Sequence, residues 1–262
     1  MRIFFVLAIY MGKIAFCFLV YDKIVRHDIW NKFFKNCNRE EYDVIIHSKF
    51  SFGIQYLNEI YKFKYREIGR DDAVNTISKT HISIVQATLL LFKKALEDQQ
   101  ISHIVFLSQS CIPLHSYHKL FGLINRTERS MIDYKLNNSL ERHAALERSL
   151  QNRISKQFFL KQQPNMILIR RDAEMYVNKS MIREWSRVIC ADEHYFINNA
   201  IHIFKMDILK VQINFCNINL NRTQALTFNN VTINFTNQLR ERGFLFMRKI
   251  DKNSKIDLSY LD

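Results

Sequence analysis

The stretch "KIAFCFLVY", residues 13–21, is apolar after its first lysine, and a second apolar run, "YDVIIHSK" (42–49), follows it. Between them, "HDIWNKFFKNC" (27–37) repeats its large apolar residues at helical spacing. A strand that lacks polar alternation is typical of a parallel sheet that is covered on both faces. The order strand, helix, strand therefore predicts an α/β fold whose first buried strand is entered from Lys13.

The rest of the chain continues this alternation. A helix is expected over residues 83–98, with Ser83 near its start, and a second helical region around "MIREWSRVI" (181–189). Residues 51–79 predict a surface loop with one short strand. Further strands are expected at "SHIVFLS" (102–108), "NMILIRR" (165–171) and "FLFMRKI" (244–250). We therefore predict a mainly parallel central sheet with helices on both faces, and a ligand site beyond the carboxyl ends of its strands.

The amino terminus supports two interpretations. Residues 3–21 are apolar apart from Gly12 and Lys13, and about 20 such residues can cross a bilayer. A lysine in the middle of a span costs about 2.5–3.5 kcal/mol, which argues against one. We favour an apolar leader over residues 1–12 and a single domain over 13–262. An amino-terminal membrane anchor is the alternative, so the location in the cell stays open.

The net charge of +13 and the pI near 9.5 favour an anionic partner. The basic residues are scattered without an arginine-rich arm, so solvated basic faces are the commoner explanation and a nucleic-acid partner is the weakest one. The five cysteines include no C-x-x-C pair and predict mostly free thiols.

Several common signatures are missing from the sequence. It has no G-x-G-x-x-G, no P-loop and no H-E-x-x-H. It also has no Asp-x-Asp, the element with which many sugar-nucleotide enzymes hold a divalent metal. A transferase that depends on that element is therefore disfavoured.

Two adjacent carboxylates open the stretch "ADEHYFINNA" (191–200). Negative charge at the first turn of a helix interacts well with the helix dipole, which alone could explain them. If the stretch is one helix, however, Glu193 shares a face with Phe196, Ile197 and Ala200. Apolar shielding would then raise the pKa of Glu193 toward the working pH, which suits a general base.

With these blocks in order, the chain resembles the core-2/I-branching β-1,6-N-acetylglucosaminyltransferase family, most closely its plant-type members, with xylosyltransferases as relatives. The resemblance rests on residues 13–19, 42–49, 83–87 and 244–250 and, most specifically, on "FLSQSCIPL" (106–114) and "ADEHYF" (191–196). It implies a GT-A-like nucleotide-diphospho-sugar transferase fold and inversion at the anomeric carbon without a metal. The implied donor is a UDP-sugar carrying GlcNAc, or alternatively xylose, and the implied acceptor is a hydroxyl of a glycan or glycoprotein. No other cofactor is expected.

The resemblance also implies roles for individual residues. Glu193 becomes the catalytic base, with Asp192 in a structural role beside it, and Lys249 contacts the departing diphosphate, with Arg248 next to it. Strand alternation predicts that these two cations point to opposite faces, so that only one enters the pocket. His47 falls close to the nucleoside, and Ser110 falls on the acceptor side.

Alternatives remain for several of these positions. His47 could be a core histidine bonded to a backbone carbonyl, and Lys249 part of a solvated basic strand end. The family's tryptophan is missing from "LKQQPNMILI" (160–169), which leaves the acceptor less defined than the donor. A second cation on the diphosphate is not fixed, and its candidates are Arg222, Arg240 and Arg242.

Three functions therefore compete. The leading one is a metal-independent inverting glycosyltransferase. The second is a catalytically inactive, glycan-binding or scaffold descendant of the same fold, and the third is a basic nucleic-acid-binding protein.

Overall fold

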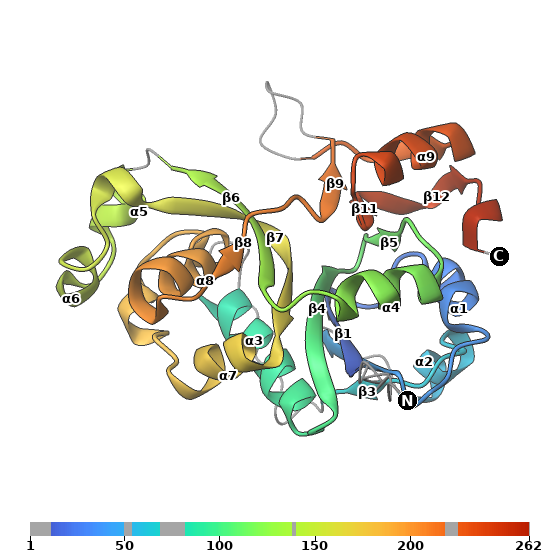
Figure 1. The fold of residues 1–262 in the computed structure, drawn as a ribbon, viewed down its shortest axis with the longest axis horizontal. Coiled ribbons are helices and arrows are strands. Elements are labelled where there is room, and N and C mark those ends of the chain that lie inside the picture. The colour runs from blue at the N-terminus through green and yellow to red at the C-terminus, as the bar shows by residue number, and fades with distance from the viewer. Residues whose placement is uncertain (1–11, 50–53, 69–81, 138–139, 218–224, 262) are drawn as a thin grey trace, which may run out of the picture.

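The computed structural model describes residues 12–49, 54–68, 82–137, 140–217 and 225–261. Its centre is a seven-stranded sheet with the strand order β3-β2-β1-β4-β7-β6-β8 (Figure 1). The strands are β1 Lys13–Val20, β2 Tyr42–Ser48, β3 Arg66–Glu67, β4 Ile101–Ser108, β6 Ser130–Leu136, β7 Leu160–Ile169 and β8 Ile208–Leu209.

Strand direction divides this sheet. β1 pairs in parallel with β2 and β4, and β2 with β3, whereas β7 is antiparallel to both β4 and β6, and β8 is parallel to β6. β7 therefore runs against all the other strands of the sheet. Because of this reversal, the start of β7 lies at the same edge as the carboxyl ends of β1, β2 and β4.

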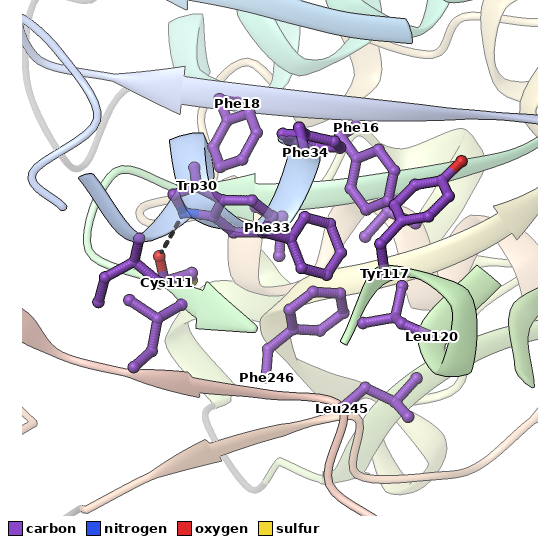
Figure 2. Close-up of a cluster of buried hydrophobic side chains, with 14 of the residues drawn as sticks. Phe16, Phe18, Trp30, Phe33, Phe34, Cys111, Tyr117, Leu120, Leu245 and Phe246 are labelled. Carbon is purple, nitrogen blue, oxygen red and sulfur yellow. Dashed lines mark hydrogen bonds between the residues drawn. The ribbon is translucent and has the colours of Figure 1, made fainter. Parts of the chain in front are cut away.

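Both faces of β1 are buried, which explains its continuous apolar sequence. Ile14, Phe16 and Phe18 belong to one hydrophobic cluster, whereas Ala15 and Cys17 belong to the other. In the first cluster, Trp30 contacts Phe18 edge to face at 4.9 Å between ring centroids (Figure 2). Aromatic pairs of this geometry contribute about 0.5–1.5 kcal/mol beyond the area that they bury.

Helices cover the two faces of the sheet. The first cluster is covered by α1 (His27–Phe34) and α4 (Tyr117–Asn125), and the second by α3 (Ser83–Leu96), α7 (Arg170–Asn178) and α8 (Tyr195–Asn198). The remaining helical segments are α2 Ile54–Ile60, α5 Leu140–Ala144, α6 Arg148–Gln151, α9 Ile233–Glu241, the 3₁₀ turns η1 Lys156–Phe158, η2 Arg183–Trp185, η3 Ala191–Glu193 and η5 Ser259–Leu261, and the π-helix η4 Asn199–Phe204.

The C-terminal part of the chain returns to the carboxyl edge of the parallel strands. Two of its strands join β5 in a three-stranded sheet, β5-β11-β9, and two others form a two-stranded sheet, β10-β12 (Figure 1). Their strands are β5 Ile112–Pro113, β9 Asn214–Cys216, β10 Phe228–Val231, β11 Phe246–Arg248 and β12 Ile250–Ile256. Because β5 directly follows the turn after β4, this small sheet brings residues near the end of the chain to that turn.

The predicted α/β class, with a mainly parallel sheet and helices on both faces, is confirmed. The predicted strands at 13–21, 42–49 and 102–108 and the helix at 83–98 agree with β1, β2, β4 and α3. All five cysteines are free thiols, as expected.

Three boundaries differ from the predictions. The strand expected at 165–171 starts earlier, at Leu160, and gives way to α7 at Arg170. The single strand expected at 244–250 is divided into β11 and β12. The loop expected at 51–79 contains α2 as well as the predicted short strand, β3; residues 69–81 lie outside the described residues.

The predicted leader also lies outside the described residues, apart from Gly12. Within the part of the chain that the structure describes, none of the helices combines the length and the apolar character that a membrane crossing requires. The division into a leader and one domain over 13–262 stays a prediction.

Candidate functional site

The turn after β4 is fastened to the end of β1. The backbone N–H of Tyr21 donates to Oε1 of Gln109 at 2.6 Å, and the N–H of Val25 donates to the Gln109 carbonyl at 3.0 Å. The ends of two parallel strands are thus tied together at the edge where a site was expected.

A buried polar network lies below this turn. The Trp30 indole donates to the Cys111 carbonyl at 3.0 Å (Figure 2). The Asn165 amide, on β7, donates to Sγ of Cys111 at 3.3 Å and accepts from Nδ2 of Asn214 at 3.2 Å. The network therefore joins the turn to β7 and to β9.

Three of the predicted site residues meet at the turn. The Ser110 carbonyl accepts from the N–H of Ile250 at 3.1 Å, and Arg248 pairs with Cys216 in the β11–β9 register. Burial raises the pKa of the Cys216 thiol, and the charges of Arg248 and Lys249 act against that rise. Ser110, Arg248 and Lys249 therefore occupy one region. Because β11 ends at Arg248, the strand alternation expected for Lys249 does not reach it.

The stretch 191–200 is helical in three separate pieces and does not form one continuous helix. Ala191–Glu193 form the 3₁₀ turn η3, and His194 leaves helical geometry with φ of −132° before α8 begins at Tyr195. The π-helix η4 then starts at Asn199. Glu193 therefore does not share a regular helical face with Phe196 and the apolar residues after it.

Instead, Glu193 lies between two cations. Its Oε2 accepts from Nη1 of Arg142, on α5, at 3.0 Å and lies 2.9 Å from Nζ of Lys161, on β7. Both cations contact the same carboxylate oxygen. Oε1 has no hydrogen bond among the described residues.

The pKa of Glu193 shifts in the direction opposite to the expected one. Burial favours a higher pKa for Glu193, but the hydrogen bonds and charges of Lys161 and Arg142 outweigh it and lower this pKa below its ordinary value. Burial and then the charge of Glu193 raise the pKa of Asp192 to about 6. The raised pKa predicted for Glu193 is therefore wrong, because sequence spacing did not show the two cations.

β7 connects the Glu193 region to the turn after β4. Asn165 contacts the turn, and Lys161, four residues earlier on the same strand, contacts Glu193. Four strand residues span at most about 13 Å. Glu193 and the region of Ser110, Arg248 and Lys249 thus belong to one edge of the sheet.

The other predicted positions are less directly placed. His47 is completely buried on β2, and burial lowers its pKa, which matches the alternative of a core histidine; its assignment to the donor stays a prediction. The Arg240 guanidinium lies 5.1 Å from the ring centre of Tyr260, and that of Arg242 lies 5.0 Å from Phe244. Arg222 lies outside the described residues.

Three residues of the site were not predicted: Arg142, Lys161 and His194. Lys161 and His194 fall inside sequence blocks that were already recognised, whereas Arg142 has no motif around it. Among the described residues, no group of three or more His, Cys, Asp or Glu side chains could hold a metal ion.

Comparison with known proteins adds the following likenesses. The family model described as Core-2/I-Branching enzyme matches residues 14–227. A curated protein, "Glycosyltransferase BC10" from Oryza sativa subsp. japonica, is 24% identical over 123 residues, which are 47% of this chain and 30% of that protein. The chain thus spans less than a third of the length of this relative.

Solved structures give weaker likenesses. The WbbM bifunctional glycosyltransferase in its apo form is 10% identical and has a TM-score of 0.47, covering 90% of this chain and 45% of that one. The galactosyltransferase LgtC, solved with donor and acceptor sugar analogues, is 10% identical and has a TM-score of 0.44, covering 76% of this chain and 75% of that one.

Proposed function

This chain belongs to the Core-2/I-branching enzyme family, a family of glycosyltransferases, and we propose that it transfers a sugar from a UDP-sugar to a hydroxyl of a glycan or protein, with inversion and without a metal. GlcNAc is the proposed sugar, and xylose is the alternative. Glu193 is the general base, and Lys249 holds the diphosphate.

The observation that carries this proposal is the geometry of the Glu193 carboxylate. Two cations hold it through Oε2, while Oε1 has no hydrogen bond among the described residues. A carboxylate fixed in this way is ionised and presents one oxygen in a defined position. General-base catalysis contributes about 10²–10⁴ in rate when the pKa of the base lies near the working pH. The lowered pKa keeps Glu193 ionised and also makes it a weaker proton acceptor.

The proposed reaction proceeds in one displacement. The acceptor hydroxyl oxygen attacks the anomeric carbon while Oε1 of Glu193 takes its proton, and the bond from that carbon to the diphosphate oxygen breaks on the opposite face. UDP leaves with the bonding electron pair. The anionic diphosphate is stabilised by Lys249 and, beside it, Arg248, which act as fixed cations.

We assign diphosphate binding and proton removal to two different regions of the proposed site. Ser110, Arg248 and Lys249 lie at the turn after β4, and Glu193 lies further along the same edge. Asn165, which contacts Cys111 next to Ser110, and Lys161, which contacts Glu193, are four residues apart on β7, a span of at most about 13 Å. This arrangement supports a donor end and a base end of one site. Asp192 has a structural role beside the base.

A substitution at the base tests the proposal. Glu193→Gln keeps the side-chain shape but cannot accept the proton, so UDP release from UDP-GlcNAc should fall by about 10²–10⁴, while the Kd for UDP stays within about twofold by titration calorimetry. Assays run with and without EDTA should agree.

The matched control is Glu174→Gln. Glu174 also forms an ion pair, with Arg170 at 2.7 Å, but lies on α7 away from the carboxyl edge. It should leave turnover unchanged. Full activity in Glu193→Gln would remove Glu193 from the mechanism, and UDP binding without any turnover in the wild type would support the inactive, glycan-binding alternative.

A further inference from the structure

The side chain of His194 is completely buried next to the proposed base. Its ring stacks on Phe159, with 4.8 Å between the ring centroids and 13° between the planes. Nδ1 lies 2.7 Å from the Leu160 carbonyl oxygen, and Nε2 lies 2.9 Å from Nη1 of Arg142. Both ring nitrogens are therefore engaged, and the stack on Phe159 fixes the plane of the ring.

These two contacts determine where the ring proton is. A carbonyl oxygen only accepts hydrogen bonds, so Nδ1 carries the proton and donates it to Leu160. A guanidinium only donates, so Nε2 is unprotonated and accepts from Arg142. Burial also lowers the pKa of His194 to about 4, which agrees with a neutral ring.

Arg142 in turn connects this ring to Glu193. The same Nη1 lies 2.9 Å from Nε2 of His194 and 3.0 Å from Oε2 of Glu193. The histidine therefore limits where the guanidinium can lie, and the guanidinium limits which carboxylate oxygen is occupied.

We propose that His194 is a positioning residue for the reaction: its unprotonated Nε2 holds Arg142 against Oε2 of Glu193 and thereby leaves Oε1 to take the acceptor proton. This inference rests on the proposed function, because it assigns the base to Glu193. His194 itself touches neither substrate nor reacting atoms.

The charged groups that face Glu193 determine how its pKa should change when Arg142 is released. Lys161 comes from β7 and Arg142 from α5. The neighbours along the chain are Asp192, His194 and the Cys190 thiol, whose pKa is raised by burial and then by the charge of Glu193. If Arg142 is released, one of two cations is lost and the pKa of Glu193 rises. The ionised base is then lost at a higher pH, so the acid limb of the kcat–pH profile moves upward.

Two substitutions at His194 separate the roles of the ring. His194→Phe keeps the stack on Phe159 but removes the acceptor for Arg142. The Leu160 carbonyl still accepts from Nδ2 of Asn198 at 2.8 Å, so this variant leaves no orphaned acceptor there. His194→Gln restores an acceptor oxygen. His103→Phe is the control, because His103 is buried as well but its Nε2 faces the Thr127 carbonyl.

The measurements combine carboxyl-carbon NMR titration of Glu193, identified by its loss in Glu193→Gln, with the pH profile of UDP release from UDP-GlcNAc. In His194→Phe, we expect the midpoint of the Glu193 titration and the acid limb of the UDP-release profile both to move upward by about one pH unit. Both should return toward the wild-type position in His194→Gln and stay unmoved in His103→Phe. The Kd for UDP should not change.

A double substitution locates the effect. In an Arg142→Met background, His194→Phe should cause no additional movement of the Glu193 titration. An unmoved titration in His194→Phe, or a full shift that persists without Arg142, would overturn the positioning role. A wild-type protein that binds UDP but releases none from UDP-sugars would instead overturn the proposed function, and the titration would still show whether His194 acts through Arg142.

Discussion

Asp192 should weaken the folded protein at neutral pH, and Asp192→Asn should reveal by how much. Oδ1 of Asp192 is buried without a hydrogen-bond partner among the described residues. Burial first, and the charge of Glu193 second, raise the pKa of this carboxyl from its ordinary 3.8 to about 6. The folded state therefore binds the Asp192 proton more tightly than the unfolded state does.

The size of the effect follows from this difference. About two pH units at about 1.36 kcal/mol each correspond to about 3 kcal/mol. Because the folded pKa is the higher one, the stabilisation from the bound proton is complete below pH 3.8 and is lost as the pH rises through about 6. The amide that Asp192→Asn introduces cannot ionise, so the variant has no such loss.

Urea unfolding of both proteins between about pH 4 and pH 8 measures the difference in unfolding free energy. That difference should move in favour of Asp192→Asn by about 2–3 kcal/mol across the range. If the new amide changes the unfolding free energy by the same amount at every pH, the change of the difference with pH is unaffected. Asp207→Asn is the control, because the Asp207 side chain is 71% exposed. A difference that stays flat with pH would refute a buried, proton-binding Asp192.

Two further substitutions test the packing of the sheet. A Cβ at Gly12 would lie 2.3 Å from Oγ of Ser102, so Gly12→Ala should lower the unfolding free energy by about 1–3 kcal/mol, and adding Ser102→Gly should restore most of it; no recovery would contradict the clash. Nη2 of Arg66 lies 2.5 Å from Oδ2 of Asp43, whose side chain is only 6% exposed, so Arg66→Met leaves a buried carboxylate without its cation. We expect the unfolding free energy, measured in urea, to fall by about 3–5 kcal/mol. A fall of less than about 1 kcal/mol would contradict this expectation.

The central strands could be predicted because each is apolar over its whole length. In β1, neighbouring residues face different hydrophobic clusters, so neither face required polar positions. The continuous apolar sequence of β1 therefore directly indicates that both of its faces are buried. For β11 and β12 the pattern was too short to show where one strand ends and the next begins.

The stretch at Asp192 and Glu193 could not be predicted in the same way. Apolar residues follow it at helical spacing, but His194 is held by Leu160 and Arg142 and departs from helical geometry. The pKa of Glu193 depends on Lys161 and Arg142, which are distant in sequence and meet only after β7 and α5 are in place. No local pattern contains that information.

The two tryptophans of the chain provide separate fluorescence reporters for the two ends of the proposed site. Trp30 donates its indole proton to the Cys111 carbonyl at the turn after β4, and Nε1 of Trp185 lies 3.3 Å from Oδ1 of Asn199, where the π-helix begins. With Trp185→Phe, the emission of Trp30 would follow events near Lys249. With Trp30→Phe, the emission of Trp185 would follow events near Glu193, because Trp185 stacks on Phe159 and Phe159 on His194. The two variants would then time the arrival of the proposed donor and acceptor separately.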